Sequence, residues 1–91
     1  MSATVRIPTQ LRSLAGGASE VTVDSGTVGS VLDSLETSHP GFRERLFDDA
    51  GKLRRFVNVF VAEEDVRFLE GLDTKVADGQ TVSIVPAVAG G

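Results

Sequence analysis

One segment of this chain has the hydrophobic spacing of a helix, and it lies between segments with the spacing of strands. Val28, Val31, Leu32 and Leu35 recur at the three- and four-residue intervals that place side chains on one helical face. The segments on either side alternate hydrophobic and polar residues, as strands with one buried face do. We therefore expect one main helix among several strands.

Four segments alternate in this way: residues 4–7, 20–24, 57–61 and 81–85. The first two are separated by a turn region containing Gly16-Gly17, which predicts a hairpin. Residues 63–77 are polar and irregular, and Val66, Phe68 and Leu69 allow at most one short strand there. Asp78-Gly79 is a strong turn signal before the last strand.

The ends of the main helix are also marked. Ser25 or Thr27 can cap its first turn, and His39-Pro40 should end it, because proline disfavours helical geometry in the residue before it. Phe42, Leu46 and Phe47 then suggest a second, short helical turn.

This order of elements predicts an α+β domain in which one main helix packs across one face of a mixed sheet, the β-grasp arrangement. Three β-branched residues make the valine side of residues 57–61 the better core face. Asn58 and Phe60 then point to the outer face, with Phe60 exposed or half covered. We interpret this outer face as solvated or as a partner-docking surface around these two residues.

Composition argues against several functions. The 91 residues fit one domain, and nine basic against thirteen acidic residues, with no basic stripe, make nucleic acid an unlikely partner. A zinc site is improbable, because the chain has no cysteine and only one histidine, His39. No apolar run approaches the roughly 20 residues of a membrane span, and no signal peptide precedes the domain, so we expect a cytoplasmic protein.

The other informative segment is the C-terminus, Pro86-Ala87-Val88-Ala89-Gly90-Gly91. Because proline cannot donate a hydrogen bond to a sheet, strand pairing should fail near Pro86. We expect residues 1–86 to form the domain and residues 87–91 to form a flexible tail.

A tail of small residues can thread a narrow channel in another protein. We expect Val88, Ala89 and Gly90 to occupy such a channel and the carboxylate of Gly91 to be the reacting group. The chain would then need no catalytic side chain, cofactor or metal of its own, and we expect it not to be an enzyme.

Two stretches carry a family resemblance: Phe56-Val57-Asn58-Val59, and the run from Asp78-Gly79 to the terminal Gly90-Gly91. Together they resemble the ubiquitin-like sulfur carriers, which include the small subunit of molybdopterin synthase and the thiamin-biosynthesis carrier. Weaker similarity extends over the whole chain, and the overall pattern is closest to the carriers that supply sulfur for cysteine synthesis.

This resemblance implies a cycle run by other proteins. An ubiquitin-activating-like adenylyltransferase and sulfurtransferase would adenylate Gly91 with ATP and convert it to a thiocarboxylate. The thiocarboxylate would attack an aminoacrylate held by a PLP-dependent cysteine synthase, and a JAMM-type zinc metalloprotease would release the product. ATP, PLP and zinc belong to these partners.

Alternatives remain open from the sequence. Gln80 and Ala87 stand where family members often have aspartate and proline, which leaves the identity of the partners less certain. The sulfur could serve molybdopterin or thiamin synthesis instead. The chain could also be a protein modifier conjugated through Gly91, or a non-covalent β-grasp adaptor.

Overall fold

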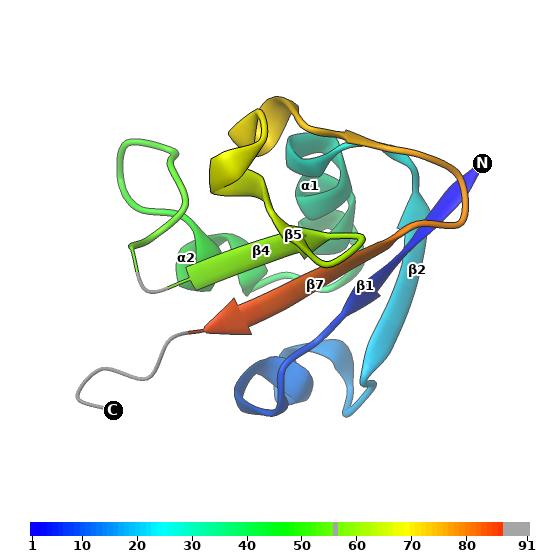
Figure 1. The fold of residues 1–91 in the computed structure, drawn as a ribbon. Coiled ribbons are helices and arrows are strands. Elements are labelled where there is room, and N and C mark those ends of the chain that lie inside the picture. The colour runs from blue at the N-terminus through cyan, green and yellow to red at the C-terminus, as the bar shows by residue number, and fades with distance from the viewer. Residues whose placement is uncertain (56, 87–91) are drawn as a thin grey trace.

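The chain forms a five-stranded mixed sheet with its main helix across one face (Figure 1). This computed structural model describes residues 1–55 and 57–86. The strand order is β2-β1-β7-β4-β5, and the β1–β7 pair is parallel whereas the others are antiparallel. The strands are β1 (Ser2–Arg6), β2 (Glu20–Asp24), β4 (Val57–Val61), β5 (Glu64–Asp65) and β7 (Thr81–Pro86). The predicted α+β β-grasp fold is confirmed.

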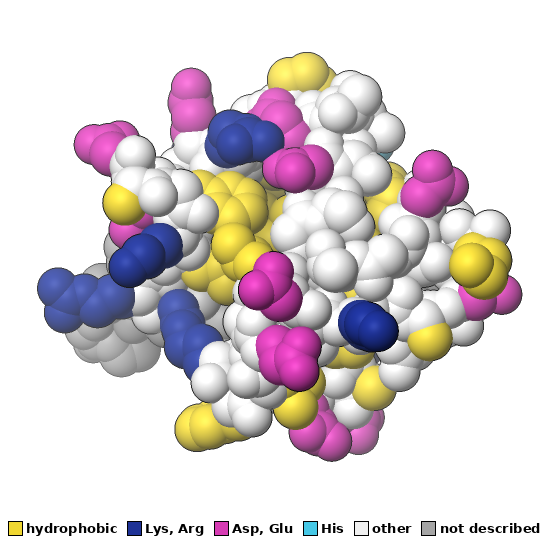
Figure 2. Space-filling model, turned by 90° about the horizontal axis from the view of Figure 1, so that it is seen from above, with side chains coloured by type: hydrophobic (Ala, Val, Ile, Leu, Met, Phe, Trp, Pro, Cys, Tyr) yellow, Lys and Arg dark blue, Asp and Glu magenta, His cyan; other side chains and the backbone are white. Residues whose placement is uncertain are grey.

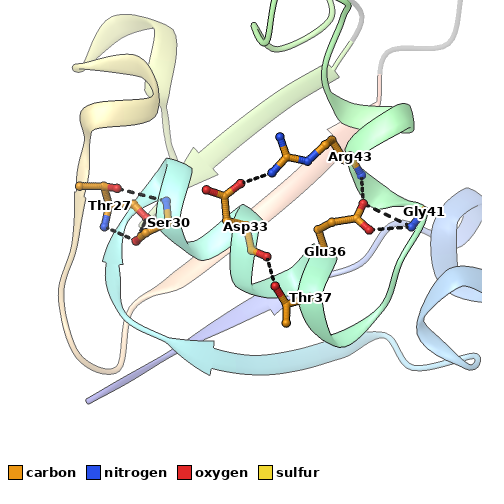
Figure 3. A network of polar contacts seen from close by, with 7 residues as sticks. All are labelled: Thr27, Ser30, Asp33, Glu36, Thr37, Gly41 and Arg43. Atoms are coloured by element: carbon orange, nitrogen blue, oxygen red, sulfur yellow. Dashed lines mark hydrogen bonds and ion pairs between the residues drawn. The ribbon is translucent and has the colours of Figure 1, made fainter.

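The main helix, α1 (Val28–Ser38), begins with a reciprocal pair of hydrogen bonds (Figure 3). The Ser30 amide donates to the Thr27 hydroxyl over 3.2 Å, and the Thr27 amide donates to the Ser30 hydroxyl over 2.9 Å. Thr27, one of the two predicted caps, is therefore the N-cap, and this capping box occupies amides that the helix leaves without partners. The predicted hydrophobic face of α1 is buried, which confirms the sequence pattern.

The other end of α1 is tied to a second, short helix, α2 (Phe42–Leu46), as predicted. The Glu36 carboxylate accepts hydrogen bonds from the amides of Gly41 and Arg43, at 3.0 and 2.7 Å, and so spans the turn between the helices (Figure 3). Arg43 also pairs with Asp33 at 2.8 Å. These contacts place Phe42 in the core, where its side chain is fully buried.

Two segments differ from the sequence prediction. Residues expected as a plain turn form a 3-10 helix, η1 (Thr9–Ala15), because Leu11 and Ala15 both reach the core. Val66, Phe68 and Leu69 allowed at most one short strand; the strand β5 lies just before them, and η2 (Val66–Phe68) is a 3-10 helix. Asp65 caps it by accepting from the Arg67 amide at 2.8 Å, and only Val66 of its residues is buried.

The remaining elements close the far end of the sheet. A two-stranded ladder pairs β3 (Gly26–Thr27) with β6 (Lys75–Val76), and η3 (Gly71–Asp73) lies before β6. The predicted Asp78-Gly79 turn leads into β7, with Gly79 at a φ of 84°. In residues 1–55 and 57–86 no helix is both long and apolar enough to cross a membrane.

Candidate functional site

The candidate site lies at the end of β7, where Pro86 is the last residue of the strand. Val57, at the start of β4, faces Pro86, at the end of β7. The start of β4 and the residues before it therefore lie at the sheet end from which the chain continues to its terminus (Figure 1). Gly91, whose carboxylate is the predicted reacting group, and the predicted threading residues Val88, Ala89 and Gly90 lie outside the described residues.

The outer face of the sheet beside this end carries both predicted docking residues. Asn58 pairs in register with Val85, and Phe60 pairs with Ser83. Val57, Val59 and Val61 are buried on the core face, as predicted, which leaves Asn58 and Phe60 half-buried on the outer face. Val85 is 45% exposed, although it is a large hydrophobic residue in the middle of the sheet. The structure thus brings a small, partly apolar surface next to the end of β7.

Arg67 holds this end of the sheet together. Its guanidinium donates to the side-chain oxygen of Asn58 at 2.7 Å and to the carbonyls of Val57 and Arg54 at 2.8 and 2.9 Å. Hydrogen bonds from a charged donor are stronger than neutral ones. Arg67 therefore orients Asn58 and fixes the chain that enters β4. Sequence reasoning missed this residue, because nothing in an irregular polar segment marks which arginine meets distant carbonyls.

Phe68, the next residue, is the second feature that the sequence did not reveal. Its side chain is 87% exposed, and the neighbouring Leu69 is 41% exposed. In a strand, Phe68 would lie on the same face as Val66, because side chains alternate with a period of two. The 3-10 geometry of η2 separates them, so only Val66 reaches the core.

The described residues hold no group of side chains that could bind a metal ion. Among residues 1–55 and 57–86, no three His, Cys, Asp or Glu side chains lie close enough to hold a metal ion. His39 is the C-cap of α1, where its amide donates to the Leu35 carbonyl at 2.8 Å. Of the acidic run before η2, Asp65 serves as a cap, and Glu63 and Glu64 are exposed.

Comparison with known proteins agrees with this picture. The model of the ThiS family matches residues 5–91. The sulfur carrier protein CysO of Mycobacterium tuberculosis is 52% identical over 93 aligned residues, which cover the whole of both chains. A chain in the crystal structure of the Amycolatopsis orientalis BexX/CysO complex is 48% identical, with a TM-score of 0.92 over 98% of this chain and 99% of that one. Small archaeal modifier protein 3 of Haloferax volcanii is 44% identical over 75% of this chain and 73% of its own length.

The fold and this similarity define a sulfur carrier of the ubiquitin-like type. The chain belongs to the ThiS family. Within that family it is a CysO-like sulfur carrier protein, similar to CysO over its full length, and its role is that of a carrier rather than a catalyst.

Proposed function

We propose that the C-terminal carboxylate of Gly91 carries the sulfur. In the first step a carboxylate oxygen attacks the α-phosphate of ATP, which forms an acyl-adenylate and releases pyrophosphate. A sulfur donor then attacks the acyl carbon and AMP leaves, which yields a thiocarboxylate. Adenylation is needed because a free carboxylate is a poor electrophile.

The position of Pro86 is the observation that carries this proposal. The β4–β7 ladder reaches Pro86, which has no amide hydrogen to donate, and five residues follow it in the sequence. Fully extended, five residues span at most about 18 Å. That length is enough to reach into a pocket of a protein docked against the end of the sheet.

We further propose that residues 1–86 are the folded body and residues 87–91 the segment that enters the partner. Val88, Ala89 and Gly90 would occupy the partner's channel, since small side chains fit a narrow passage. Fixing each backbone residue costs roughly 1–2 kcal/mol. Contacts made by the body must offset that cost, and Phe60 and Asn58 on the outer face are the proposed docking residues.

The proposed partners are those of a cysteine-forming cycle in the cytoplasm. An adenylyltransferase and sulfurtransferase would load the carrier, and the thiocarboxylate would donate its sulfur to an aminoacrylate on a PLP-dependent cysteine synthase. A JAMM-type zinc metalloprotease would then release the amino acid from Gly91. ATP, PLP and zinc would all be bound by these enzymes. The similarity to CysO favours this pathway over molybdopterin or thiamin synthesis.

Intact mass spectrometry tests the proposal. The chain is incubated with the adenylating enzyme, ATP and a sulfide source, with ATP omitted as the control. We expect the mass change of one oxygen replaced by one sulfur, located at Gly91 by fragmentation, and no change in a variant lacking Gly90-Gly91. Sulfur transfer by that shortened variant would overturn the proposal.

A second candidate is a protein modifier conjugated through Gly91, which the similarity to small archaeal modifier protein 3 favours. Both functions need the same adenylate and differ in what attacks it. An amine of a target protein in place of sulfide gives an amide bond. Conjugates on other proteins in the cell, found by following a tagged form of this chain, would identify the modifier.

A further inference from the structure

Positive charge gathers at the end of the sheet where β7 leads to the C-terminus. Residues 43–58 contain five basic and three acidic residues, whereas the rest of the chain contains four basic and ten acidic residues. Residues 43–58 therefore carry a net positive charge within an otherwise acidic chain. On the face drawn in Figure 2, most of the visible Lys and Arg side chains lie on the left, the side toward which β7 ends in Figure 1.

Four of these cations form a surface that we name the basic rim: Arg45, Lys52, Arg54 and Arg55. Backbone hydrogen bonds join its parts, because the Arg54 amide donates to the Leu46 carbonyl at 2.9 Å. Arg54 and Arg55 immediately precede β4, whose Val57 faces Pro86. The rim therefore lies near Pro86, after which the chain continues to its C-terminus.

The rim cations differ from other arginines of the chain in how their charge is balanced. Arg6 pairs with Glu20 at 3.6 Å and Arg43 with Asp33 at 2.8 Å. Within residues 1–55 and 57–86, none of the four rim side chains has a carboxylate within ion-pair distance. The side chains of Arg45, Lys52 and Arg55 are exposed, and none of them donates a hydrogen bond to another described residue.

We propose that the basic rim docks against an acidic patch on the protein that receives the C-terminus, beside the mouth of its pocket. This inference rests on the proposed delivery of Gly91 and adds the chemistry of the receiving surface. Like charges left together on one end of a protein attract a complementary surface and orient its approach. An acidic surface placed there would turn the carrier so that Pro86 faces the pocket.

The charge of the whole chain favours a protein over a nucleic acid or an anionic membrane. The part of the chain outside residues 43–58 has an excess of six negative charges and would be repelled by an extended polyanion. A compact acidic patch on a protein could contact the four rim residues without approaching the acidic remainder of this chain's surface.

Single charge reversals with a matched control test the rim. Arg55→Glu changes the charge inside the rim, and Lys75→Glu makes the same change on β6, near the start of β7 rather than its end. Both side chains are exposed, and thermal unfolding should show that both variants stay folded. Affinity for the adenylating enzyme is measured without ATP, in low and in high salt.

We expect Arg55→Glu to weaken binding about tenfold at low ionic strength and Lys75→Glu to change it less than about twofold. The difference should shrink at about 0.5 M salt, because screening weakens exposed charge pairs. Arg45→Glu combined with Arg55→Glu should weaken binding further. Equal affinities of the two single variants, or a loss that salt does not reduce, would overturn the proposal.

Two further measurements separate this proposal from its alternatives. If the rim instead held ATP phosphates, the Arg55→Glu defect would appear in the KM for ATP and not in ATP-free binding, which would contradict a docking role. Tighter binding of the parent chain to single-stranded RNA or to phosphatidylserine vesicles than to the enzyme would also overturn it. Failure of the proposed function would give a different result from failure of the rim proposal: the parent chain itself would gain no sulfur at Gly91, whatever the affinities of the variants.

Discussion

Val57 faces Pro86 across the antiparallel pair formed by β4 and β7. Val57 is buried on the core face, and its carbonyl accepts a hydrogen bond from Arg67 at 2.8 Å. The residue opposite Pro86 is therefore fixed from two directions, by packing and by the guanidinium. In the proposed function residues 87–91 leave the domain at Pro86, and a fixed neighbour at this exit point would set the direction in which they leave.

The first prediction concerns Gly91 itself. Gly91→Ala should lower the rate of adenylation by on the order of 100-fold, since a small displacement of a reacting group is costly. The melting temperature should stay at the parent value, because the change lies outside the described core. Pyrophosphate exchange with the adenylating enzyme measures the rate, and Ser13→Ala serves as a neutral surface control. Equal exchange by Gly91→Ala and the parent would contradict a narrow channel.

The second prediction compares one substitution at two positions. Phe42 is fully buried and Phe68 is 87% exposed. Phe42→Ala should lower the free energy of unfolding by about 3–5 kcal/mol, from lost burial and the cavity left behind. Phe68→Ala should change it by no more than about 0.5 kcal/mol. Denaturant unfolding measures both, and a large loss at Phe68 would show that η2 packs differently.

The contrast between these two phenylalanines shows what the sequence could and could not predict. The face of α1 and the alternation in β4 were predictable, because local periodicity decides which side chains meet the core. Phe68 and Arg67 were not predictable. Their environment depends on η2 meeting the carbonyls of Arg54 and Val57, which only the folded sheet brings within reach. Conversely, Gly91 could be proposed from the sequence alone, since its chemistry belongs to the main chain.

The third prediction concerns the capping box of α1. Thr27→Ala should cost about 1 kcal/mol of stability, because the Ser30 amide loses its acceptor. Thr27→Ser retains the hydroxyl and should stay close to the parent. Ser30→Ala removes the reciprocal bond to the Thr27 amide, so the double variant should cost less than the sum of the two single changes. Strict additivity would mean that the two bonds act independently.

The fourth prediction concerns the outer face of the sheet. Phe60→Ala should weaken binding of the adenylating enzyme by about tenfold or more, which corresponds to about 1.4 kcal/mol, because aromatic residues at interfaces carry much of the binding energy. Thr22→Ala, an exposed change on β2 at the opposite edge of the sheet, should leave affinity at the parent value. Titration calorimetry measures both. If Phe60→Ala binds like the parent, docking does not use this face.

The last prediction concerns Arg67, whose two terminal nitrogens reach Asn58, Val57 and Arg54. Arg67→Gln should lower the free energy of unfolding by about 1–2 kcal/mol, since it loses charge-assisted bonds to partners that water can partly satisfy. Arg67→Lys should recover only part of the loss, because an ammonium lacks the planar fork that meets several acceptors at once.

Arg45→Gln is the matched control, because the Arg45 side chain is exposed and donates to no described residue, and the change should leave stability unchanged. Hydrogen exchange separates a local from a global effect. We expect the amides at the start of β4 to exchange faster in Arg67→Gln while those of α1 keep their protection, since the lost bonds anchor only that end of the sheet. Uniform acceleration across both elements would show that Arg67 stabilises the whole domain, and it would no longer be the residue that fixes the exit point at Pro86.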